Sequence, residues 1–266
     1  MTIISIQQLV AHRGLQCEYP ENTALSVSKA IAAGALFIEI DIQLSRDKQP
    51  MVYHDVTLDR VSGRHGQISE LDCNELLAIP AYEPTRLGEE FVDETIAPLA
   101  RVVETVLQHP QVTLFVELKE ESIQQFGATV MLSRVCDVLL PIRDRAVLIS
   151  FDYPIIAAAR ASGWPQVGPV LRNWSDLAST AIESINAEYT FVDHKIIPQV
   201  ADLTKLTTRL VVYEVDNVEL ASGLINRGVP ILETFKIATL LGKPNRPALN
   251  SHSKQDKLWR KQLIYA

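Results

Sequence analysis

The stretch Leu36–Ile42 reads Leu-Phe-Ile-Glu-Ile-Asp-Ile and is apolar apart from two carboxylates at alternate positions. Its apolar character predicts a buried strand. Side chains two residues apart on a strand point to the same side, so Glu39 and Asp41 are expected to face one way, about 7 Å apart. The stretch therefore predicts a buried strand whose end carries a pair of acidic groups.

Polar turn residues, 45–49, come next and are followed by the short apolar run Pro50–Tyr53. A strand, a turn and a second strand within so few residues form a hairpin, so the second strand is expected to run antiparallel to the first. Residues 55–97 are irregular, with scattered glycines and prolines. We interpret them as a small insertion and not as a separate domain.

Outside this insertion, strand-like runs alternate with helical ones. Expected parallel strands are 8–11, 36–42, 112–118, 146–151, 166–171, 189–193, 210–215 and 229–233. Expected helices are 22–34, 98–108, 122–139, 153–162, 175–186, 198–206, 217–226 and 235–241. Eight strand–helix units predict an α/β fold that closes into a (β/α)₈ TIM barrel over residues 1–242, with a β-hairpin arm after the second strand.

The bulk composition excludes several classes of protein. A net charge of −7 and a pI near 5.4 argue against a nucleic-acid partner. No run is long enough for an integral membrane segment, and Met1–Val10 does not resemble a secretory signal. Three cysteines without ligand-like spacing are typical of thiols in a reducing compartment, so a cytoplasmic location is expected.

The C-terminal tail, 243–266, breaks the alternation and carries six Lys/Arg against one Asp. We interpret it as a flexible or surface-docked extension, and a basic tail for a membrane surface or a partner is the alternative.

Polar residues follow several of the predicted strands. His12 and Arg13 come after the first, and Glu117 and Lys119 end the strand at 112–118. The carboxyl ends of barrel strands meet at one rim, so these groups are expected to lie near Glu39 and Asp41. An all-carboxylate set favours Mg²⁺ or Ca²⁺ over zinc. The alternative is that Glu39 or Asp41 lies on a solvated face or pairs with Lys119.

His12 and His54 are candidates for acid/base chemistry, because both lie at predicted strand ends with a charged neighbour. The alternative for each is a packing role. Arg13 offers a planar fork suited to a phosphate oxygen, and Lys119 would add a second positive charge. A cation, an arginine and a lysine at one point describe a pocket for a phosphate ester.

These residues carry a resemblance to the glycerophosphodiester phosphodiesterase family, whose barrel type is shared with phosphatidylinositol-specific phospholipases C. The matching segments are Ala11–Gly14, Pro20–Thr23, Glu39–Asp41, Pro50–Asp55, Thr57–Arg60 and Glu117–Lys119, with weaker matches at Ser150-Phe151 and Gly168–Leu171. The resemblance implies a TIM-barrel hydrolase of small glycerophosphodiesters. It also implies a divalent ion on Glu39, Asp41 and Glu117, an acid/base pair of His12 and His54, and phosphate binding by Arg13 and Lys119. By the same resemblance, the insertion would cap the substrate's glycerol.

The chain departs from the family pattern near its end. Tyr213-Glu214-Val215-Asp216 stands where the family usually has Trp-Thr-x-Asn, and Thr234-Phe235, after Glu233, replaces Thr-Asp. Glu21, Tyr213 and Glu214 are further pocket candidates. Glu214 would contact the metal or a hydroxyl, or disfavour an anionic leaving group, unless it points outward or lies in a salt bridge.

Three alternatives to this function follow from the sequence. The first is a lysophospholipase D, or a phospholipase or sphingomyelinase that forms cyclic products, on the same barrel. Loop 79–92 offers few apolar residues for a lipid, which favours a water-soluble diester. The second is a barrel that binds metal and phosphate without turnover. The third, an HD-type phosphohydrolase, is disfavoured because His54-Asp55 lies on a strand. The oligomeric state is not predicted.

Overall fold

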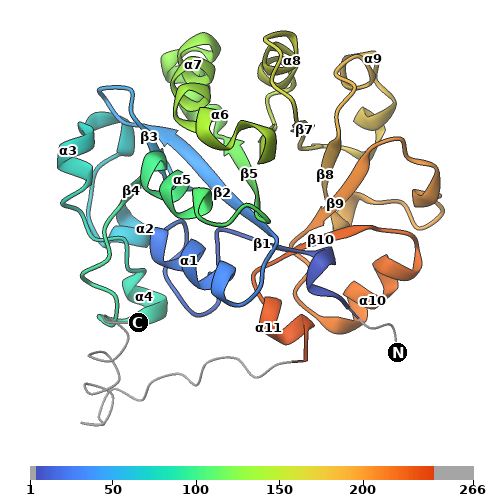
Figure 1. Ribbon diagram of the computed structural model, residues 1–266, viewed down its shortest axis with the longest axis horizontal. Coiled ribbons are helices and arrows are strands. Elements are labelled where there is room, and N and C mark those ends of the chain that lie inside the picture. The colour runs from blue at the N-terminus through green and yellow to red at the C-terminus, as the bar shows by residue number, and fades with distance from the viewer. Residues whose placement is uncertain (1–3, 243–266) are drawn as a thin grey trace.

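Eight parallel strands form the centre of the molecule in the computed structural model, which describes residues 4–242 (Figure 1). These strands are β1 (Leu9–Ala11), β2 (Phe37–Leu44), β5 (Thr113–Leu118), β6 (Ala146–Ser150), β7 (Val167–Pro169), β8 (Tyr189–Asp193), β9 (Arg209–Tyr213) and β10 (Ile231–Thr234). Each lies where the sequence predicts a strand, within a few residues at the ends.

The strands follow one another around a nearly closed ring, in the order β7-β6-β5-β2-β1-β10-β9-β8. The two end strands, β7 and β8, meet through a parallel bridge between Val170 and Phe191. Leu171 N donates to Phe191 O there, at 2.8 Å. Gly168 allows the close approach of the two strands at this seam, because a Cβ on it would lie 3.2 Å from Tyr189 O. The predicted (β/α)₈ barrel is confirmed.

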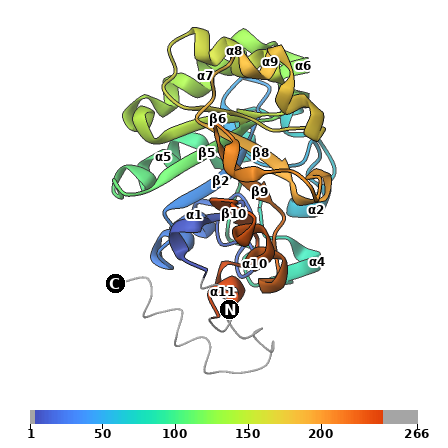
Figure 2. The ribbon, with the colours of Figure 1, turned by 90° about the vertical axis from the view of Figure 1, so that its right-hand side faces the viewer.

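Helices surround the strands on the outside (Figure 2). The regular ones are α1 (Ala24–Ala32), α5 (Leu99–Leu107), α6 (Glu120–Phe126), α7 (Ala128–Leu139), α8 (Tyr153–Ala161), α9 (Thr180–Glu183), α10 (Val218–Asn226) and α11 (Ile237–Leu240). Thr23 caps α1 as its side chain accepts from Ser26 N, which agrees with the predicted cap at Asn22-Thr23.

Three predicted helices differ from the structure. The helix expected at 122–139 is two helices, α6 and α7, because Gly127 between them has φ +86°. The helix expected at 175–186 is a 3₁₀ segment, Trp174–Ala178, followed by the one-turn α9, since extended Ser179 interrupts it. No α-helix forms at 198–206, where the only helical segment is the 3₁₀ turn Leu203–Lys205. There Asp202 accepts from Thr204 N and closes a local turn instead.

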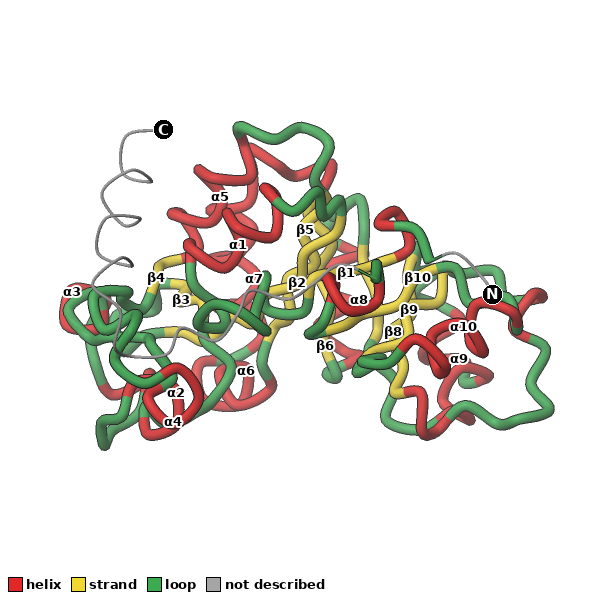
Figure 3. Tube along the Cα trace, turned by 90° about the horizontal axis from the view of Figure 1, so that it is seen from below, coloured by secondary structure: helices red, strands yellow, loops and turns green. Residues whose placement is uncertain are grey.

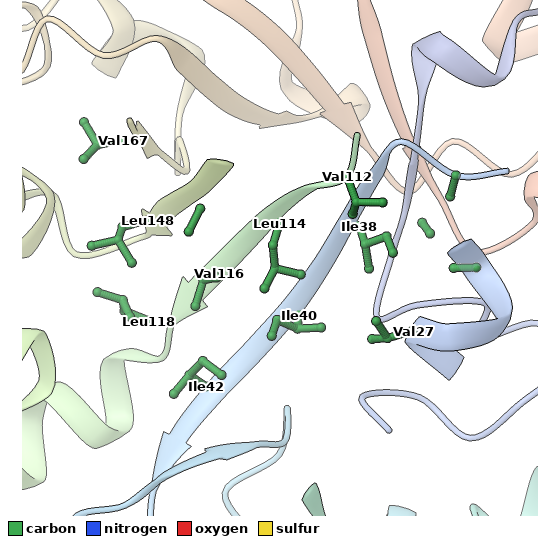
Figure 4. Packing of buried hydrophobic residues seen from close by; sticks show 14 of the residues in the cluster. Val27, Ile38, Ile40, Ile42, Val112, Leu114, Val116, Leu118, Leu148 and Val167 are labelled. Carbon is green, nitrogen blue, oxygen red and sulfur yellow. The ribbon is translucent and has the colours of Figure 1, made fainter. Parts of the chain in front are cut away.

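Alternation along β2 and β5 separates two apolar layers. Figure 4 shows Ile38, Ile40 and Ile42 of β2 packed beside Leu114, Val116 and Leu118 of β5, in the cluster between barrel and helices. The intervening residues belong to the barrel interior, where Phe115 packs against Phe191 with ring centroids 5.0 Å apart. The same alternation places Glu39, Asp41 and Glu117 on the inner side.

The hairpin arm is confirmed by β3 (Pro50–Val52), which pairs antiparallel with β2. An unexpected strand, β4 (Ala97–Pro98), pairs with β3. Between them lie α2 (Asp59–Ser62), a 3₁₀ turn (Ile68–Glu70), α3 (Cys73–Leu76) and α4 (Pro84–Leu87). Figure 3 shows these helices at the opposite end of the molecule from α9 and α10. The insertion packs on a small apolar cluster of its own, which includes Tyr53 and Ile68.

The tail predicted at 243–266 lies outside the described residues. Within 4–242, no single helix has the length and hydropathy to cross a membrane. Glu120–Phe126 and Ala128–Arg145 would have them only when taken together, and they are bent by 116°.

Candidate active site

A cavity of about 330 Å³ opens at the carboxyl ends of the barrel strands. Its lining includes every predicted site residue except Glu21: His12, Arg13, Glu39, Asp41, His54, Glu117, Lys119, Tyr213 and Glu214. These residues come from both ends of the described chain, and the barrel topology brings them together. Glu21 lies behind this lining, where its Oε1 is 3.0 Å from Arg13 Nη1.

Three carboxylates form the acidic centre of the cavity. Glu39 and Asp41 on β2 are each 1% exposed, and Asp41 is the register partner of Glu117 on β5. Glu39, Asp41 and Glu117 each offer an oxygen, and these oxygens lie within 4.8 Å of one another. Glu39 Oε1 is buried without a hydrogen-bond partner among the described residues. The predicted metal-ligand set is therefore assembled in one place.

The three carboxylates differ in their electrostatic surroundings. Burial, followed by the charges of Asp41 and Glu233, raises the pKa of Glu39 well above its ordinary value. Burial also raises the pKa of Glu117. Burial acts in the same direction on Asp41, but Lys119 Nζ at 3.4 Å and Arg13 Nε at 3.2 Å outweigh it and lower its pKa. The cluster as a whole holds more negative charge than its neighbours balance.

The loop after β1 fixes the position of Asp41. Asn22 donates from Nδ2 to Asp41 Oδ2 at 2.8 Å, and its Oδ1 accepts from Asp41 N at 3.1 Å. Asn22 and Arg13 both have φ +54°, in the left-handed region. Gly14 has φ +79°, and a Cβ on it would lie 2.5 Å from Ser26 Oγ, so the turn needs a glycine here.

Oxygen ligands at this spacing fit a hard divalent cation better than zinc. The unpartnered, buried oxygen of Glu39 and the raised pKa of two of the three carboxylates are what a cation would relieve. Two other groupings among the described residues have ligand-like spacing. Arginines already neutralise the grouping of Glu21, His54 and Asp55, and the grouping of His12, Glu39 and Glu233 shares Glu39 with the predicted set. The residues present therefore fit a cation at Glu39, Asp41 and Glu117.

His12 is held by two carboxylates and an aromatic ring. Its Nε2 lies 3.2 Å from Glu233 Oε1 and 3.7 Å from Glu39 Oε2. Phe235 stacks on the imidazole, with centroids 4.2 Å apart and planes inclined by 10°. Burial, together with the charge of Arg13, lowers the pKa of His12 well below its ordinary value. The imidazole is therefore neutral near pH 7.

His54 reaches the rim because β3 runs back along β2. Tyr53 N donates to Asp41 O at 2.9 Å, which places the next residue beside the carboxylate cluster. His54 Nδ1 lies 2.7 Å from Asp55 Oδ1. This contact gives Nδ1 a carboxylate partner, which orients the imidazole at the rim.

Arg60 of α2 connects His54 to the phosphate-binding candidates. It forms a bidentate pair with Asp55, at 2.7 and 2.8 Å, and another with Glu21, at 2.7 and 2.8 Å. Glu21 in turn pairs with Arg13. The continuous chain His54–Asp55–Arg60–Glu21–Arg13 was not predicted, although Arg60 stood in a matching sequence segment.

Arg13 and Lys119 bring positive charge to the same point. Lys119 Nζ lies 2.9 Å from Glu117 Oε1, and both cations contact Asp41. Each side chain is mostly buried, which strengthens its attraction for an anion in the cavity. The pair is placed where a phosphate would meet the carboxylate cluster.

Three charged residues of the lining were not predicted as site residues: Asp193, Lys195 and Glu233. Asp193 ends β8, so the rule that strand ends carry site residues would have found it. Glu233 lies within β10, one residue before Thr234-Phe235, where the sequence departs from the family pattern. Among the described residues, none from 55–97 lines the cavity. The insertion contacts the site through Arg60 instead.

The model of the glycerophosphoryl diester phosphodiesterase family matches residues 12–232. Glycerophosphodiester phosphodiesterase 1 of Mus musculus is 34% identical over 110 residues, which are 41% of this chain and 33% of the mouse protein. The glycerophosphodiester phosphodiesterase of Bacillus altitudinis is 31% identical over 150 residues, 56% of this chain and 60% of that protein. The chain thus spans about a third of the mouse protein and three fifths of the bacterial one.

Solved structures share the fold. A phosphodiesterase from Oleispira antarctica, in complex with the product sn-glycerol-3-phosphate, has a TM-score of 0.77 at 24% identity, covering 92% of this chain and 97% of its own. The glycerophosphodiester phosphodiesterase of Agrobacterium tumefaciens has a TM-score of 0.69 at 18% identity, covering 89% and 99%. At these identities the likeness establishes the barrel fold alone.

Proposed function

The chain belongs to the glycerophosphoryl diester phosphodiesterase family, and from that premise we propose that it hydrolyses a small glycerophosphodiester to an alcohol and glycerol 3-phosphate. The observation that carries this proposal is the meeting of two histidines, two cations and three carboxylates around one cavity. Phosphodiester cleavage needs a base, an acid and stabilisation of charge on the phosphoryl oxygens. The cavity offers a candidate for each.

Arg13 and Lys119 bind the phosphate in this proposal. The guanidinium is always charged and its fork matches two phosphate oxygens, whereas the ammonium acts as a point charge. Asp41 lies between them, at 3.2 Å from Arg13 and 3.4 Å from Lys119. The carboxylate therefore keeps the two cations close together and limits where an anion can sit.

Glu39, Asp41 and Glu117 hold a divalent cation, Mg²⁺ or Ca²⁺, in this proposal. When bound, such an ion polarises a phosphoryl oxygen and offsets the negative charge of the transition state. The unpartnered Oε1 of Glu39 and the raised pKa of Glu39 and Glu117 support the assignment.

His12 acts as the base and His54 as the acid. The lowered pKa of His12 keeps its imidazole neutral and able to accept a proton. Asp55, 2.7 Å from His54 Nδ1, orients the imidazole that gives a proton to the leaving alcohol. The attacking group is water or the glycerol 2-hydroxyl, and the second route gains from its tethered nucleophile.

The alternative functions are not favoured by what surrounds the cavity. A silent binding barrel would have no need of both histidines beside the carboxylates. A lipid substrate calls for an extended apolar rim. Of the apolar residues in loop 79–92, only Val92 is exposed, at 44%, and the others are buried or half-buried: Ile79, Ala81, Tyr82, Leu87 and Phe91.

The test is release of glycerol 3-phosphate from glycerophosphocholine and glycerophosphoethanolamine, with Mg²⁺, with Ca²⁺ and with EDTA. We expect release with one of the ions and its loss in EDTA. A cyclic phosphate among early products would identify the glycerol hydroxyl as the nucleophile. Folded protein that binds the cation but releases nothing from either diester would refute the proposal.

Single-histidine variants test the two roles. His12→Ala and His54→Ala should each lower kcat by about a thousandfold, within the usual range for an acid or base. His109→Ala, a histidine in the loop after α5 and outside the cavity lining, is the matched control and should keep wild-type kcat. Wild-type turnover in either active-site variant would remove that histidine from the mechanism.

A further inference from the structure

One wall of the cavity has no role in the mechanism above. It is formed by the carboxyl ends of β8, β9 and β10 and consists of Asp193, Lys195, Tyr213, Glu214 and Glu233, which we call the β8–β10 wall. Three of these side chains are carboxylates and one is an ammonium. The wall therefore brings net negative charge to the cavity, and within it Glu233 lies close to Glu39, a predicted metal ligand, since both contact His12.

The carboxylates of this wall line the same part of the cavity as Tyr213. Tyr213 is half-buried among them, and its pKa is raised first by burial and then by the charges of Asp193, Glu117, Glu233 and Glu214. These charges come from the ends of four different strands. Tyr213, Asp193, Glu214 and Glu233 all line the same cavity.

Lys195 offsets only part of this charge. Its Nζ lies 3.0 Å from Glu214 Oε2 and 3.5 Å from Asp193 Oδ2, and the side chain is 60% exposed. Exposed ion pairs of this kind are weak and exchange readily with solvent and ligands. An arriving cation can therefore compete for Glu214 and Asp193.

Glu233 supplies an unused acceptor in the same wall. The residue is 3% exposed, and its Oε2 has no hydrogen-bond partner among the described residues. Its other oxygen contacts His12 at 3.2 Å. A buried carboxylate oxygen without a partner is costly unless a ligand satisfies it, and this one borders the cavity.

Aromatic side chains complete the surroundings. Phe151, Phe191 and Tyr213 are among the residues that line the cavity. Aromatic faces attract ammonium groups, and quaternary ammonium ions in particular, by about 0.5–2 kcal/mol. Carboxylates and aromatic rings together are the usual surroundings of a bound organic cation.

We propose that the β8–β10 wall selects diesters whose alcohol carries a positive charge, an amino alcohol or its quaternary form, over diesters of neutral or acidic alcohols. Glu214 and Asp193 are the residues that set this preference, and Lys195 limits it. The inference rests on the proposed hydrolase function and narrows its substrate class. Arg13 and Lys119 hold the phosphate, and the ammonium, two carbons from the ester oxygen, reaches the wall.

Three diesters of similar size separate the effect of charge from that of shape. Glycerophosphoethanolamine carries an ammonium, glycerophosphoglycerol a neutral alcohol, and glycerophosphoserine an ammonium and an additional carboxylate. We expect kcat/KM to be about tenfold higher for the ethanolamine diester than for the glycerol diester, and lowest for the serine diester. Equal values for the three would overturn the inference while leaving the hydrolase function intact.

Variants of the wall should move this ratio in opposite directions. Glu214→Gln removes a carboxylate and frees Lys195, so the preference for the ethanolamine diester should fall toward one. Lys195→Met leaves the carboxylates unopposed, so the preference should rise. Glu219→Gln is the matched control, an exposed carboxylate at the start of α10 outside the cavity lining. An unchanged ratio in both wall variants would overturn the inference.

Binding measured by calorimetry separates this inference from the proposed function. Dissociation constants of the three diesters should follow the same order as kcat/KM. If wild type turned over none of them, the hydrolase function would fail, and the order of the dissociation constants would still decide the inference. Equal constants would overturn it.

Discussion

The two sides of the cavity differ in how completely their charges are balanced. On the side of β1, β2 and β5, which we call the motif side, Asp41 is held by Arg13, Lys119 and Asn22 within 3.4 Å. On the β8–β10 wall, one exposed lysine pairs with Asp193 and Glu214, and Glu233 keeps an unpartnered oxygen. The charges of the motif side are paired with one another, as expected for groups that hold the phosphate in one position. The incompletely paired carboxylates of the β8–β10 wall are instead available to the variable alcohol of the proposed substrate.

The largest expected effect is a loss of divalent-cation affinity in a variant of the motif side compared with a variant of the β8–β10 wall. Asp41→Asn should weaken Mg²⁺ or Ca²⁺ binding by at least about a hundredfold, because it removes an anionic ligand and leaves Arg13 and Lys119 each with one carboxylate partner fewer. Glu233→Gln, an equally buried carboxylate on the β8–β10 wall, should weaken it by much less. Calorimetric titration measures both, and equal losses would show that the cation does not belong to the motif side.

Removing the link between the insertion and the motif side should have the next largest effect. Arg60→Met breaks two bidentate pairs and leaves Asp55 and Glu21 without their shared cation, so kcat should fall about ten- to hundredfold. Arg46→Met is the control, since Arg46 pairs with Asp72 and Glu75 on the surface. If steady-state kinetics found equal losses in both variants, Arg60 would have no particular role in positioning His54.

The contribution of Glu39 and Glu233 to the free energy of unfolding of the metal-free protein should fall as pH rises above about 4.5, the ordinary value for Glu, whereas His12 contributes in the opposite direction below about pH 6.5. Burial raises the pKa of Glu39 and Glu233, so the folded state binds more protons than the unfolded state, and rising pH favours unfolding. The pKa of Asp41 is lowered, so Asp41 changes the free energy of unfolding only below pH 3.8, its ordinary pKa. Urea denaturation in EDTA should show a flatter pH dependence in Glu233→Gln, and an unchanged slope would contradict the prediction.

The smallest expected effect concerns the ring that covers His12. Phe235→Leu removes an aromatic stack with centroids 4.2 Å apart, which is worth about 0.5–1.5 kcal/mol, so kcat should fall about two- to tenfold. KM for a diester should change little, because Phe235 is not among the residues that line the cavity. A loss in KM with kcat unchanged would place the ring against the substrate and not behind the histidine.

The motif side could be predicted from sequence because each of its residues ends or follows a strand. Alternation placed Glu39 and Asp41 on one face, and the barrel rule placed Glu117 beside them, as their register shows. Lys119 was expected either to bind phosphate or to pair with an acidic residue. It lies within 3.4 Å of Asp41 and at 2.9 Å from Glu117, a position that allows both.

The β8–β10 wall was harder to predict because its charges depend on tertiary contacts. Nothing local indicates that Glu233 meets His12, 221 positions earlier in the chain, since β10 and β1 become neighbours only when the barrel closes. Arg60 is likewise joined to Glu21 by the fold of the insertion. The missing helix at 198–206 has a local cause, the turn closed by Asp202, which a periodic pattern does not detect.

The strands of the barrel are paired less extensively at the seam between β7 and β8 than elsewhere in the ring. β2 and β5 are paired over six residues, whereas β7 and β8 meet at one bridge, Val170 with Phe191. Backbone amides at the seam therefore belong to a region that opens at lower free energy than β2 and β5 and exchanges hydrogen sooner. Because β8 ends in Asp193, we expect opening at the seam to affect the β8–β10 wall before the motif side. Mutations at the β7–β8 seam should therefore relax the substrate preference without changing the residues of the motif side.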